Sequence, residues 1–315
     1  MNIVFFGSAH FGLPSLKALL KSGHKVSCVV TQPDRKKGRG MHLAQTPIKT
    51  TAEGLKIRAY QPPDINTQDA VRLLKSLNAD LFVVIAYGQI LSQEVLDIPG
   101  IMAVNVHASL LPKYRGAAPI NWSIINGDKT CGITVIKLAR KMDAGPIILQ
   151  EDFPVENEAN AITLELRLSE LAPKLLLETL ESIRNRNYTL TAQKNSAISY
   201  APKLRKEDGV IDWKKPAEKI NNLVKGCISW PGAYTYYGKK MLKIFKAKAA
   251  AFSLGPKEAR PGEIMNVSKE GITVSCEKSN LIIKELQIEG RRVMTAAEFT
   301  AGHRISAGEK FGSKN

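Results

Sequence analysis

Three polar side chains occupy positions from which they could act on one developing oxyanion. Asn105 and His107 lie at the end of the apolar run Ile101–Val106, and Asp143 follows a second apolar run, Ile133–Leu138. Side chains two residues apart on a strand point to the same side, so the amide and the imidazole would lie together. Both groups can donate hydrogen bonds to an oxygen that becomes negative during a reaction. A nearby carboxylate could orient the imidazole or carry a proton.

A structural role for each of these residues is the simpler alternative. A single polar residue at the end of a strand usually forms a cap or a turn, and Asp143 before Ala144-Gly145-Pro146 could be such a residue. Chemistry is favoured because all three converge on one expected sheet edge. The sequence contains no Gly-x-Ser-x-Gly nucleophile motif and no His, Cys or carboxylate set with metal-ligand spacing, so we expect no metal.

The glycine-containing segment from Gly7 to Gly12 is a weaker motif. It follows the first apolar run but lacks the third glycine of a dinucleotide-binding fingerprint. We therefore interpret it as a turn between a strand and a helix, which disfavours a nicotinamide-dependent dehydrogenase.

The elements that must position these residues alternate between strands and helices in the first half of the chain. Apolar runs predict strands, and residues with helical periodicity lie between them; the strands are Asn2–Phe6, Lys25–Thr31, Asp80–Ala86, Ile101–Val106 and Ile133–Leu138, and the helices are Pro14–Leu20, Asp69–Leu77 and Pro119–Ile125. This alternation predicts an α/β fold with a doubly wound parallel sheet. Sites in such sheets lie beyond the carboxyl ends of the strands.

The second half of the chain has a different pattern, with short apolar stretches separated by Gly and Pro turn signals. This pattern predicts a small all-β barrel or sandwich. We expect a catalytic domain at residues 1–188, a polar linker at 189–206 and a basic β domain at 207–315.

Net charge is the unusual feature of the composition. The 315 residues include 45 Lys and Arg against 29 Asp and Glu, a formal charge of +16. Lys219 to Lys257 contains eight lysines and no acidic residue, and a second basic cluster spans Arg35 to Arg39, where Gly38 and Gly40 predict a mobile loop. Such an excess favours a polyanionic partner, although a merely solvated basic surface remains the alternative.

Cellular location is indicated by the cysteines and the apolar runs. The four cysteines have no paired spacing and the N-terminus lacks the pattern of an export signal, which predicts reduced thiols and a cytoplasmic protein. The longest apolar run, Leu81–Ala86, is too short to span a membrane. No exposed apolar seam is evident, so we expect a monomer.

The strongest sequence signature lies in residues 105–120. Asn105-Val106-His107, Ser109-Leu110-Leu111-Pro112, Arg115-Gly116 and Pro119-Ile120, followed by Asp143-x-Gly145, resemble the folate-dependent formyltransferases. Thr31–Arg35, Ala86-Tyr87-Gly88 and Trp230-Pro231-Gly232-Ala233 extend the similarity over nearly the whole chain. Within this family the chain is most similar to members that act on aminoacylated initiator tRNA.

This resemblance implies a Rossmann-like catalytic domain, an OB-like β-barrel and two substrates. The donor would be 10-formyltetrahydrofolate, and the acceptor would be the amino group of methionine esterified to initiator tRNA. Asn105, His107 and Asp143 would be catalytic. The folate would lie against Ser109, Leu110, Leu111, Pro112, Ala86, Tyr87 and Gly88. The tRNA would contact Arg35, Lys36, Lys37 and Arg39, with Arg39 at its unpaired end, and the basic domain would add Lys239, Lys240, Lys243, Lys246 and Lys248.

The sequence departs from the family pattern at several loop positions. Ser8-Ala9-His10 replaces a usual Thr-Pro, and Met142 and Ala144 flank Asp143 where Leu and Thr are frequent. These changes affect loop detail and tRNA contacts and remove no catalytic group.

Three alternatives share the motif: a formyl-folate hydrolase, a sugar-nucleotide formyltransferase and a non-catalytic RNA-binding protein. The acid-free lysine stretch favours tRNA over water as the acceptor, and the complete Asn, His and Asp set favours an enzyme.

Overall fold

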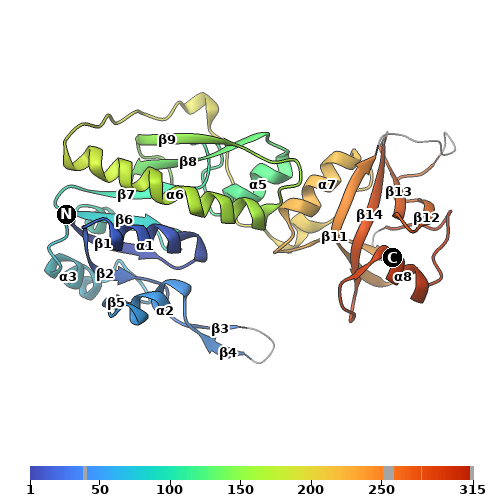
Figure 1. The fold of residues 1–315 in the computed structure, drawn as a ribbon, viewed down its shortest axis with the longest axis horizontal. Coiled ribbons are helices and arrows are strands. Elements are labelled where there is room, and N and C mark those ends of the chain that lie inside the picture. Colours follow the sequence, from blue (N-terminus) through green and yellow to red (C-terminus); the bar gives the residue numbers. More distant parts are fainter. Residues whose placement is uncertain (38–40, 251–258, 278, 313–315) are drawn as a thin grey trace. The chain divides into compact units, whose positions relative to one another are not determined.

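The chain divides into two compact units in the computed structural model, which describes residues 1–37, 41–250, 259–277 and 279–312. Unit 1 comprises Met1–Pro119, Thr130–Pro154 and Glu165–Ala201, and unit 2 comprises Ile120–Lys129, Val155–Leu164 and Pro202–Asn315 (Figure 1). Residues 189–201 of the expected linker therefore belong to unit 1. The domain boundaries at 188 and 206 stay predictions.

Unit 1 is built around a seven-stranded sheet with the strand order β5-β2-β1-β6-β7-β8-β9. In that order the strands are Ala59–Tyr60, Lys25–Val30, Asn2–Gly7, Leu81–Ile85, Met102–His107, Thr130–Lys137 and Ile147–Pro154. The first five strands are parallel. Together with the antiparallel sheet of unit 2 described below, this arrangement confirms the expected Rossmann-like α/β fold.

The last two strands of this sheet differ from the expected parallel arrangement. Strand β8 runs antiparallel to β7, with His107 opposite Thr134, and β9 runs antiparallel to β8. A parallel strand needs a crossover helix that packs on the sheet and returns the chain to the opposite edge. The helix between β7 and β8, α5 (Pro119–Asn126), belongs to unit 2 except for its first residue. The chain therefore re-enters the sheet from the edge at which β7 ends, and β8 runs back along β7.

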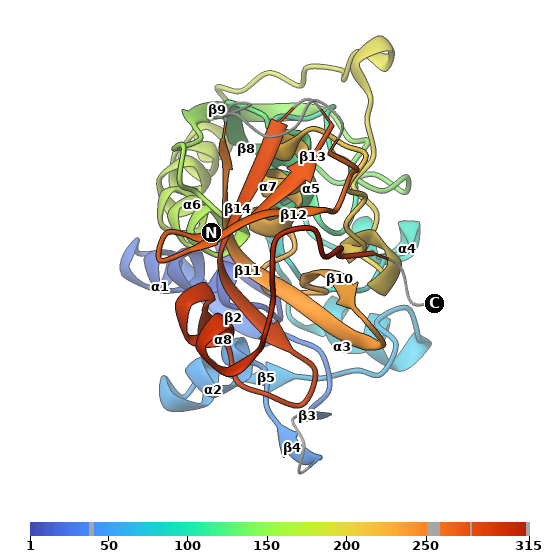
Figure 2. The same ribbon diagram turned by 90° about the vertical axis from the view of Figure 1, so that its right-hand side faces the viewer.

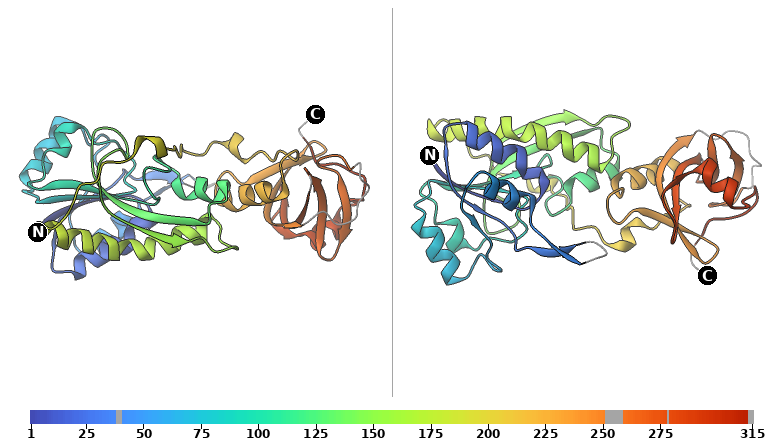
Figure 3. Two further views of the ribbon diagram at one scale, coloured as in Figure 1. Left: turned by 90° about the horizontal axis from the view of Figure 1, so that it is seen from above. Right: turned by 60° about the horizontal axis from the view of Figure 1, so that its bottom comes forward.

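Helices cover both faces of the sheet in unit 1. Helices α3 (Gln68–Ser76) and α4 (Gln93–Leu96) lie on one face, and α1 (Leu13–Lys21) and the unit 1 part of α6 (Ala161–Arg184) lie on the other (Figures 2 and 3). The side chains of β1, β6 and β7 are buried almost without exception. Burial on both faces explains why these strands are continuous apolar runs rather than alternating ones.

Local sequence signals set the starts of several helices. The side chains of Thr46, Thr67, Ser92 and Thr295 accept hydrogen bonds from backbone N–H groups in the first turns of α2 (Pro47–Gly54), α3, α4 and α8 (Ala296–Gly302). Between β1 and α1 the chain forms the short 3-10 helix η1 (His10–Gly12). The segment from Gly7 to Gly12 is thus the expected connection between a strand and a helix.

The basic cluster that begins at Arg35 forms a hairpin rather than the expected mobile loop. Strand β3 (Arg35–Lys37) pairs with β4 (His42–Ala44), and the hairpin extends from the body of unit 1 (Figure 3). The loop prediction was wrong for residues 35–37 because Gly38 and Gly40 follow this strand rather than interrupt it. Gly38, Arg39 and Gly40 lie outside the described residues.

Unit 2 contains an antiparallel sheet that closes on itself. Its strands are ordered β10-β11-β14-β13-β12, with β15 paired to β14; these strands are Ala233–Tyr237, Lys240–Ala250, Ser279–Ile288, Gly271–Cys276, Ile264–Ser268 and Met294–Thr295. Near the C-terminus, Lys310 bridges to Glu263 just before β12, and Gly312 bridges to Tyr236 in β10. The two edge strands are thus joined through one segment, which gives the expected barrel (Figure 2).

The barrel interior is apolar and includes one face of helix α7 (Ala217–Gly226). Ile220 and Val224 of α7 pack with strand residues such as Leu242, Ile244 and Leu286. Two 3-10 helices, η2 (Asn195–Ala197) in unit 1 and η3 (Lys206–Gly209) in unit 2, complete the described elements. None of the helices in the described part of the chain is long and apolar enough to cross a membrane.

A β-bulge in β11 decides where its lysines point. Leu242 and Ile244 are buried, so regular alternation would direct Lys246 and Lys248 to the same inner face. The pairing with β14 shifts on both sides of Lys246, and Ala247 and Ala249 then pack against the core. The bulge therefore reverses the alternation and leaves Lys246 and Lys248 exposed.

Candidate active site

His107 is buried at the end of β7 and is held at both ring nitrogens. Its Nε2 lies 2.9 Å from the Tyr114 carbonyl oxygen, and its Nδ1 lies 3.7 Å from Oδ2 of Asp143. A carbonyl oxygen can only accept, so Nε2 carries the hydrogen and donates it. The second distance is longer than a hydrogen bond, so the carboxylate faces Nδ1 without engaging it fully.

Asp143 reaches His107 by a route that the sequence analysis did not foresee. Because β8 is antiparallel, its carboxyl end lies beside Val104 rather than beside His107. The loop of residues 138–146 folds back along β7 and brings the carboxylate to the imidazole. Asp143 has a positive φ of 49°, and its Oδ2 accepts a hydrogen bond of 2.8 Å from the Gly116 N–H.

Asn105 lies two residues before His107 on the same side of β7. Its neighbours across the sheet are Val84 of β6 and Ile136 of β8, and only 9% of its surface is exposed. Within the described part of the chain, the Asn105 side chain has no hydrogen-bond partner. The Asn105 amide atoms are not among the fully buried unpaired polar atoms, so a ligand can reach them. The residue therefore offers an amide to whatever binds beside His107.

The signature loop after β7 is fixed through one hydroxyl group. Thr134 Oγ1 donates to the Ser109 carbonyl at 2.6 Å and accepts from the Leu111 N–H at 3.1 Å. Gln150 of β9 donates to the same hydroxyl and to the Leu111 carbonyl. These contacts tie the loop to β8 and β9 and keep its backbone in one position relative to His107.

Comparison with known proteins identifies the family to which this arrangement belongs. Residues 1–180 match the family model described as "Formyl transferase", and residues 203–304 match "Formyl transferase, C-terminal domain". The chain belongs to the formyl transferase family. The resemblance to the folate-dependent formyltransferases is thereby confirmed.

The similarity of this formyl transferase to its relatives extends over the whole chain. A methionyl-tRNA formyltransferase of Citrifermentans bemidjiense is 41% identical over 315 residues, which cover 100% of this chain and 98% of the relative. The fold resembles that of WlaRD, a sugar 3N-formyl transferase, with a TM-score of 0.67 at 20% identity over 93% of this chain and 99% of that one. The methionyl-tRNA formyltransferase from Clostridium thermocellum has a TM-score of 0.54 at 17% identity, covering 82% and 95% of the two chains.

The predicted folate residues of this formyl transferase fall into buried and accessible groups. Ser109 and Leu111 are buried, whereas Leu110 and Pro112 are half-buried. The Ser109 hydroxyl donates to the Lys113 carbonyl within the same loop. The buried pair thus shapes the loop, and the half-buried pair is more available to a ligand. That these residues bind folate stays a prediction.

The second predicted folate segment is a turn at the end of β6. Ala86 and Gly88 are exposed and have positive φ angles of 49° and 95°. The Tyr87 ring points into the core and packs edge-on against Phe6, and burial raises the pKa of its hydroxyl. Tyr87 is anchored further by its carbonyl, which accepts from the Ser8 hydroxyl at 2.9 Å. Only the exposed backbone around Ala86 and Gly88 is therefore placed to meet a ligand.

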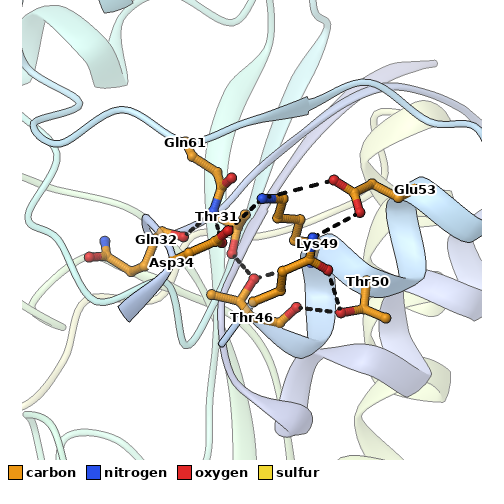
Figure 4. A network of polar contacts seen from close by, with 9 residues as sticks. Thr31, Gln32, Asp34, Thr46, Lys49, Thr50, Glu53 and Gln61 are labelled. Carbon is orange, nitrogen blue, oxygen red and sulfur yellow. Dashed lines mark hydrogen bonds and ion pairs between the residues drawn. The ribbon is translucent and has the colours of Figure 1, made fainter. Parts of the chain in front are cut away.

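A network of polar side chains lies at the start of the β3–β4 hairpin (Figure 4). Arg35 and Lys36 are exposed, and Arg35 donates to the Gln32 side chain. Lys49 Nζ lies 2.7 Å from Asp34 Oδ2, and Gln61 donates to the other carboxylate oxygen. These hydrogen bonds lower the pKa of Asp34. The network holds the start of the hairpin against α2. For Lys37 the structure describes only the backbone, which lies in β3. Arg39 lies outside the described residues.

The predicted tRNA residues of the barrel are mostly free to contact a ligand. Lys239, Lys240, Lys246 and Lys248 are exposed on the β10–β11 hairpin and along β11. Lys243 is half-buried and donates to the Pro231 carbonyl at 3.1 Å, so its ammonium group is partly engaged within the barrel. The described part of the chain contains no group of three or more His, Cys, Asp or Glu side chains arranged to hold a metal ion.

Sequence reasoning missed three residues that support the site. Thr134 and Gln150 fix the signature loop, and Gln193 bonds to the Asp143 loop and to Arg115. Thr134 interrupts the apolar run of β8 between Ile133 and Val135, which is a usable signal. Gln150 begins the polar run Gln150-Glu151-Asp152 of β9, so the strand pattern does not distinguish it. Gln193 lies in a polar segment that was expected to be a linker, and nothing in its local sequence distinguishes it.

Proposed function

We propose that this formyl transferase transfers the formyl group of 10-formyltetrahydrofolate to the α-amino group of methionine on initiator tRNA, and thereby supports translation initiation. The observation that carries the proposal is the approach of the His107 imidazole to the Asp143 carboxylate beside the unpartnered Asn105 amide. Full-length relatives named methionyl-tRNA formyltransferases support the choice of acceptor. We further propose that the protein acts as a cytoplasmic monomer.

The first step is attack of the neutral amine of the aminoacyl ester on the formyl carbon. A carbon–nitrogen bond forms, and an electron pair of the carbonyl bond moves to oxygen. Asn105 donates from its amide to this oxyanion, because its side chain has no competing partner in the described part of the chain. Removing one such donor in other enzymes typically slows the reaction by about 100- to 1,000-fold.

His107 assists through Nδ1, since its Nε2–H already donates to the Tyr114 carbonyl. The ring therefore donates at Nδ1 only in its protonated form. At 3.7 Å from Asp143, the Nδ1–H can be shared between the carboxylate and an oxyanion bound beside it. The Asp143 charge stabilises the imidazolium and orients it.

Asp143 also moves the proton that the reaction must transfer. The attacking amine becomes positively charged and has to lose a proton before the tetrahedral intermediate collapses. Oδ2 of Asp143 accepts from Gly116, which leaves Oδ1 to take this proton through a water molecule. The proton then passes to the folate nitrogen as its bond to the formyl carbon breaks. The products are tetrahydrofolate and formyl-methionyl-tRNA.

The two substrates would occupy different parts of the chain. The folate would contact the loop of Ser109 to Pro112 and the exposed turn around Ala86 and Gly88. The tRNA would contact the basic residues of the β3–β4 hairpin, Arg35, Lys36, Lys37 and Arg39. It would also contact the lysines on and beside β11, which are Lys239, Lys240, Lys243, Lys246 and Lys248. Phosphate binding by these cations would supply affinity that decreases steeply with salt.

The experiment that tests the function uses the purified full chain with 10-formyltetrahydrofolate carrying a labelled formyl group. Three reactions contain methionyl initiator tRNA, an amino-sugar nucleotide or no acceptor. We expect labelled formyl-methionine from the first reaction and little tetrahydrofolate release in the other two. Release at the same rate without acceptor would assign the chain as a hydrolase, and transfer to the sugar alone would assign it as a sugar formyltransferase.

A further inference from the structure

The side chain of Gln193 connects two parts of the candidate site that are far apart in the sequence. Its Nε2 donates to the carbonyl oxygens of Asp143 and Gly145, both at 2.7 Å. Its Oε1 accepts from Nε and Nη2 of Arg115, at 3.0 and 2.7 Å. All four residues belong to unit 1. Both N–H donors of this amide and its oxygen are therefore engaged in hydrogen bonds.

Arg115 fixes which way the Gln193 amide points. The guanidinium can only donate, so it must face the oxygen, and the NH2 group is then directed at the two carbonyl oxygens. Arg115 is 5% exposed, and no carboxylate lies within ion-pair distance of it in the described part of the chain. A buried guanidinium with a neutral amide as its partner is costly. Among the described residues the Arg115 guanidinium donates to Gln193, so the role that the structure shows for it is the orientation of the Gln193 amide.

The backbone that Gln193 holds is the part of the loop that aims the Asp143 carboxylate. Asp143 has a φ of 49°, a left-handed conformation that is strained for a non-glycine residue. At Gly145 an added Cβ would lie 1.8 Å from the Lys137 carbonyl oxygen, so the loop passes directly against β8. Two hydrogen bonds from one amide thus fix the carbonyls on both sides of Ala144 in this strained turn.

We propose that Gln193 is a positioning residue for formyl transfer: it holds the Asp143 loop so that the carboxylate faces His107 Nδ1. The inference rests on the proposed function for its kinetic consequences. Gln193 does not reach the reacting atoms itself. It acts by keeping the carboxylate within the 3.7 Å approach to the imidazole. Misplacement of a catalytic group by about 1 Å can reduce turnover by about 100-fold.

Two substitutions distinguish the role of the Gln193 oxygen from the role of its NH2 group. Gln193→Glu keeps an oxygen for Arg115 and adds an ion pair, but it removes both donors and sets a carboxylate against two carbonyl oxygens. Gln193→Ala removes both ends. If positioning of Asp143 is the role, both variants lose turnover, including Gln193→Glu, which keeps the contact with Arg115. Lys194→Ala changes an exposed neighbour in the same segment and serves as the control.

The test measures kcat and KM for both substrates and hydrogen–deuterium exchange of the peptide containing residues 139–146. We expect Gln193→Ala and Gln193→Glu to reduce kcat by about 10- to 100-fold, with both KM values within about threefold of the wild type. We expect faster exchange in residues 139–146, and no change in Lys194→Ala. Adding Gln193→Ala to Asp143→Asn should cost little further, because both act through one carboxylate.

Unchanged exchange in residues 139–146 would overturn the inference whatever the activity. Wild-type kcat in Gln193→Ala, or losses that multiply in the double variant, would also overturn it. Absence of formyl transfer by the wild type would refute the proposed function, and the exchange measurement would still decide the role of Gln193 in holding the loop.

Discussion

Burial governs the chemistry of the cysteine side chains, which lie in the cores of the two units. Cys28 is buried in β2, and burial raises the pKa of its thiol to about 11. Burial likewise raises the pKa of Cys227 and Cys276 to about 12. Thiolate is the reactive form of cysteine, so these three thiols are inert at neutral pH. They are structural residues and take no part in the proposed transfer.

This burial predicts slow thiol modification in the native protein. At pH 8, three pH units below its pKa, Cys28 is ionised in roughly one molecule in a thousand. We expect Ellman's reagent to modify Cys28, Cys227 and Cys276 at least about 100-fold more slowly in buffer than in urea. The rates at each cysteine can be followed by mass spectrometry. Rapid native modification of any of the three would contradict its burial.

Residue types and spacing suggested the candidate side chains but not how they are held. Asn105 and His107 could be predicted because period-two alternation on a strand depends only on local sequence. The Gln193 contact could not be predicted, since it joins residues 50 positions apart. The orientation of the His107 ring depends on a nearer residue, because the Tyr114 carbonyl that accepts from Nε2 lies in the loop that follows β7, and the fold of that loop sets its position.

At the scale of elements, the β3–β4 hairpin depends on the ion pair at its base. The side chains of Asp34 and Lys49 are 17% and 15% exposed, so their attraction is weakly screened. Because hydrogen bonds from Lys49 and Gln61 lower the pKa of Asp34 in the folded state, the carboxylate stabilises the fold above its ordinary pKa. The stabilisation is lost as the pH falls through the lowered pKa.

The corresponding prediction concerns Asp34→Asn, which keeps the shape of the side chain and removes the charge. We expect the free energy of unfolding to fall by about 1–2 kcal/mol at pH 7. The difference from the wild type should shrink as the pH falls below about 4, where the unfolded chain binds a proton at this carboxyl, and should vanish once the folded protein is protonated there as well. Urea unfolding at a series of pH values measures it. A difference that is constant with pH would contradict the ion-pair explanation.

Strand order and direction were only partly predictable from the sequence. Apolar runs predicted β1, β2, β6, β7 and β8 close to their observed bounds. The reversal at β8 could not be predicted, because the helical pattern at Pro119–Ile125 does not reveal that α5 packs in unit 2. The β11 bulge was also hidden, since pairing with β14 creates it. In both cases tertiary contacts overrode the local pattern.

For the whole molecule, the charge of +16 has a measurable consequence for tRNA binding. Each cation that contacts a phosphate releases counterions, so the slope of log affinity against log salt reports the number of contacts. We expect Lys246→Gln with Lys248→Gln to reduce this slope by about 1–2. The matched control is Lys174→Gln, because Lys174 lies near Glu151 and Glu178 on unit 1. Filter binding between about 50 and 200 mM salt measures the slope. An unchanged slope in the double variant would exclude these lysines from the tRNA interface.

The most direct test of the proposed mechanism is the single-turnover rate of formyl transfer by Asp143→Asn at saturating donor and methionyl-tRNA. The variant keeps an oxygen for the Gly116 N–H and loses the charge that faces His107. We predict a rate at least about 100-fold below the wild type, with unchanged folate affinity and with Asp97→Asn, an exposed aspartate on the surface, equal to the wild type. A wild-type rate in Asp143→Asn would contradict the central claim that the carboxylate and imidazole act together on the formyl group.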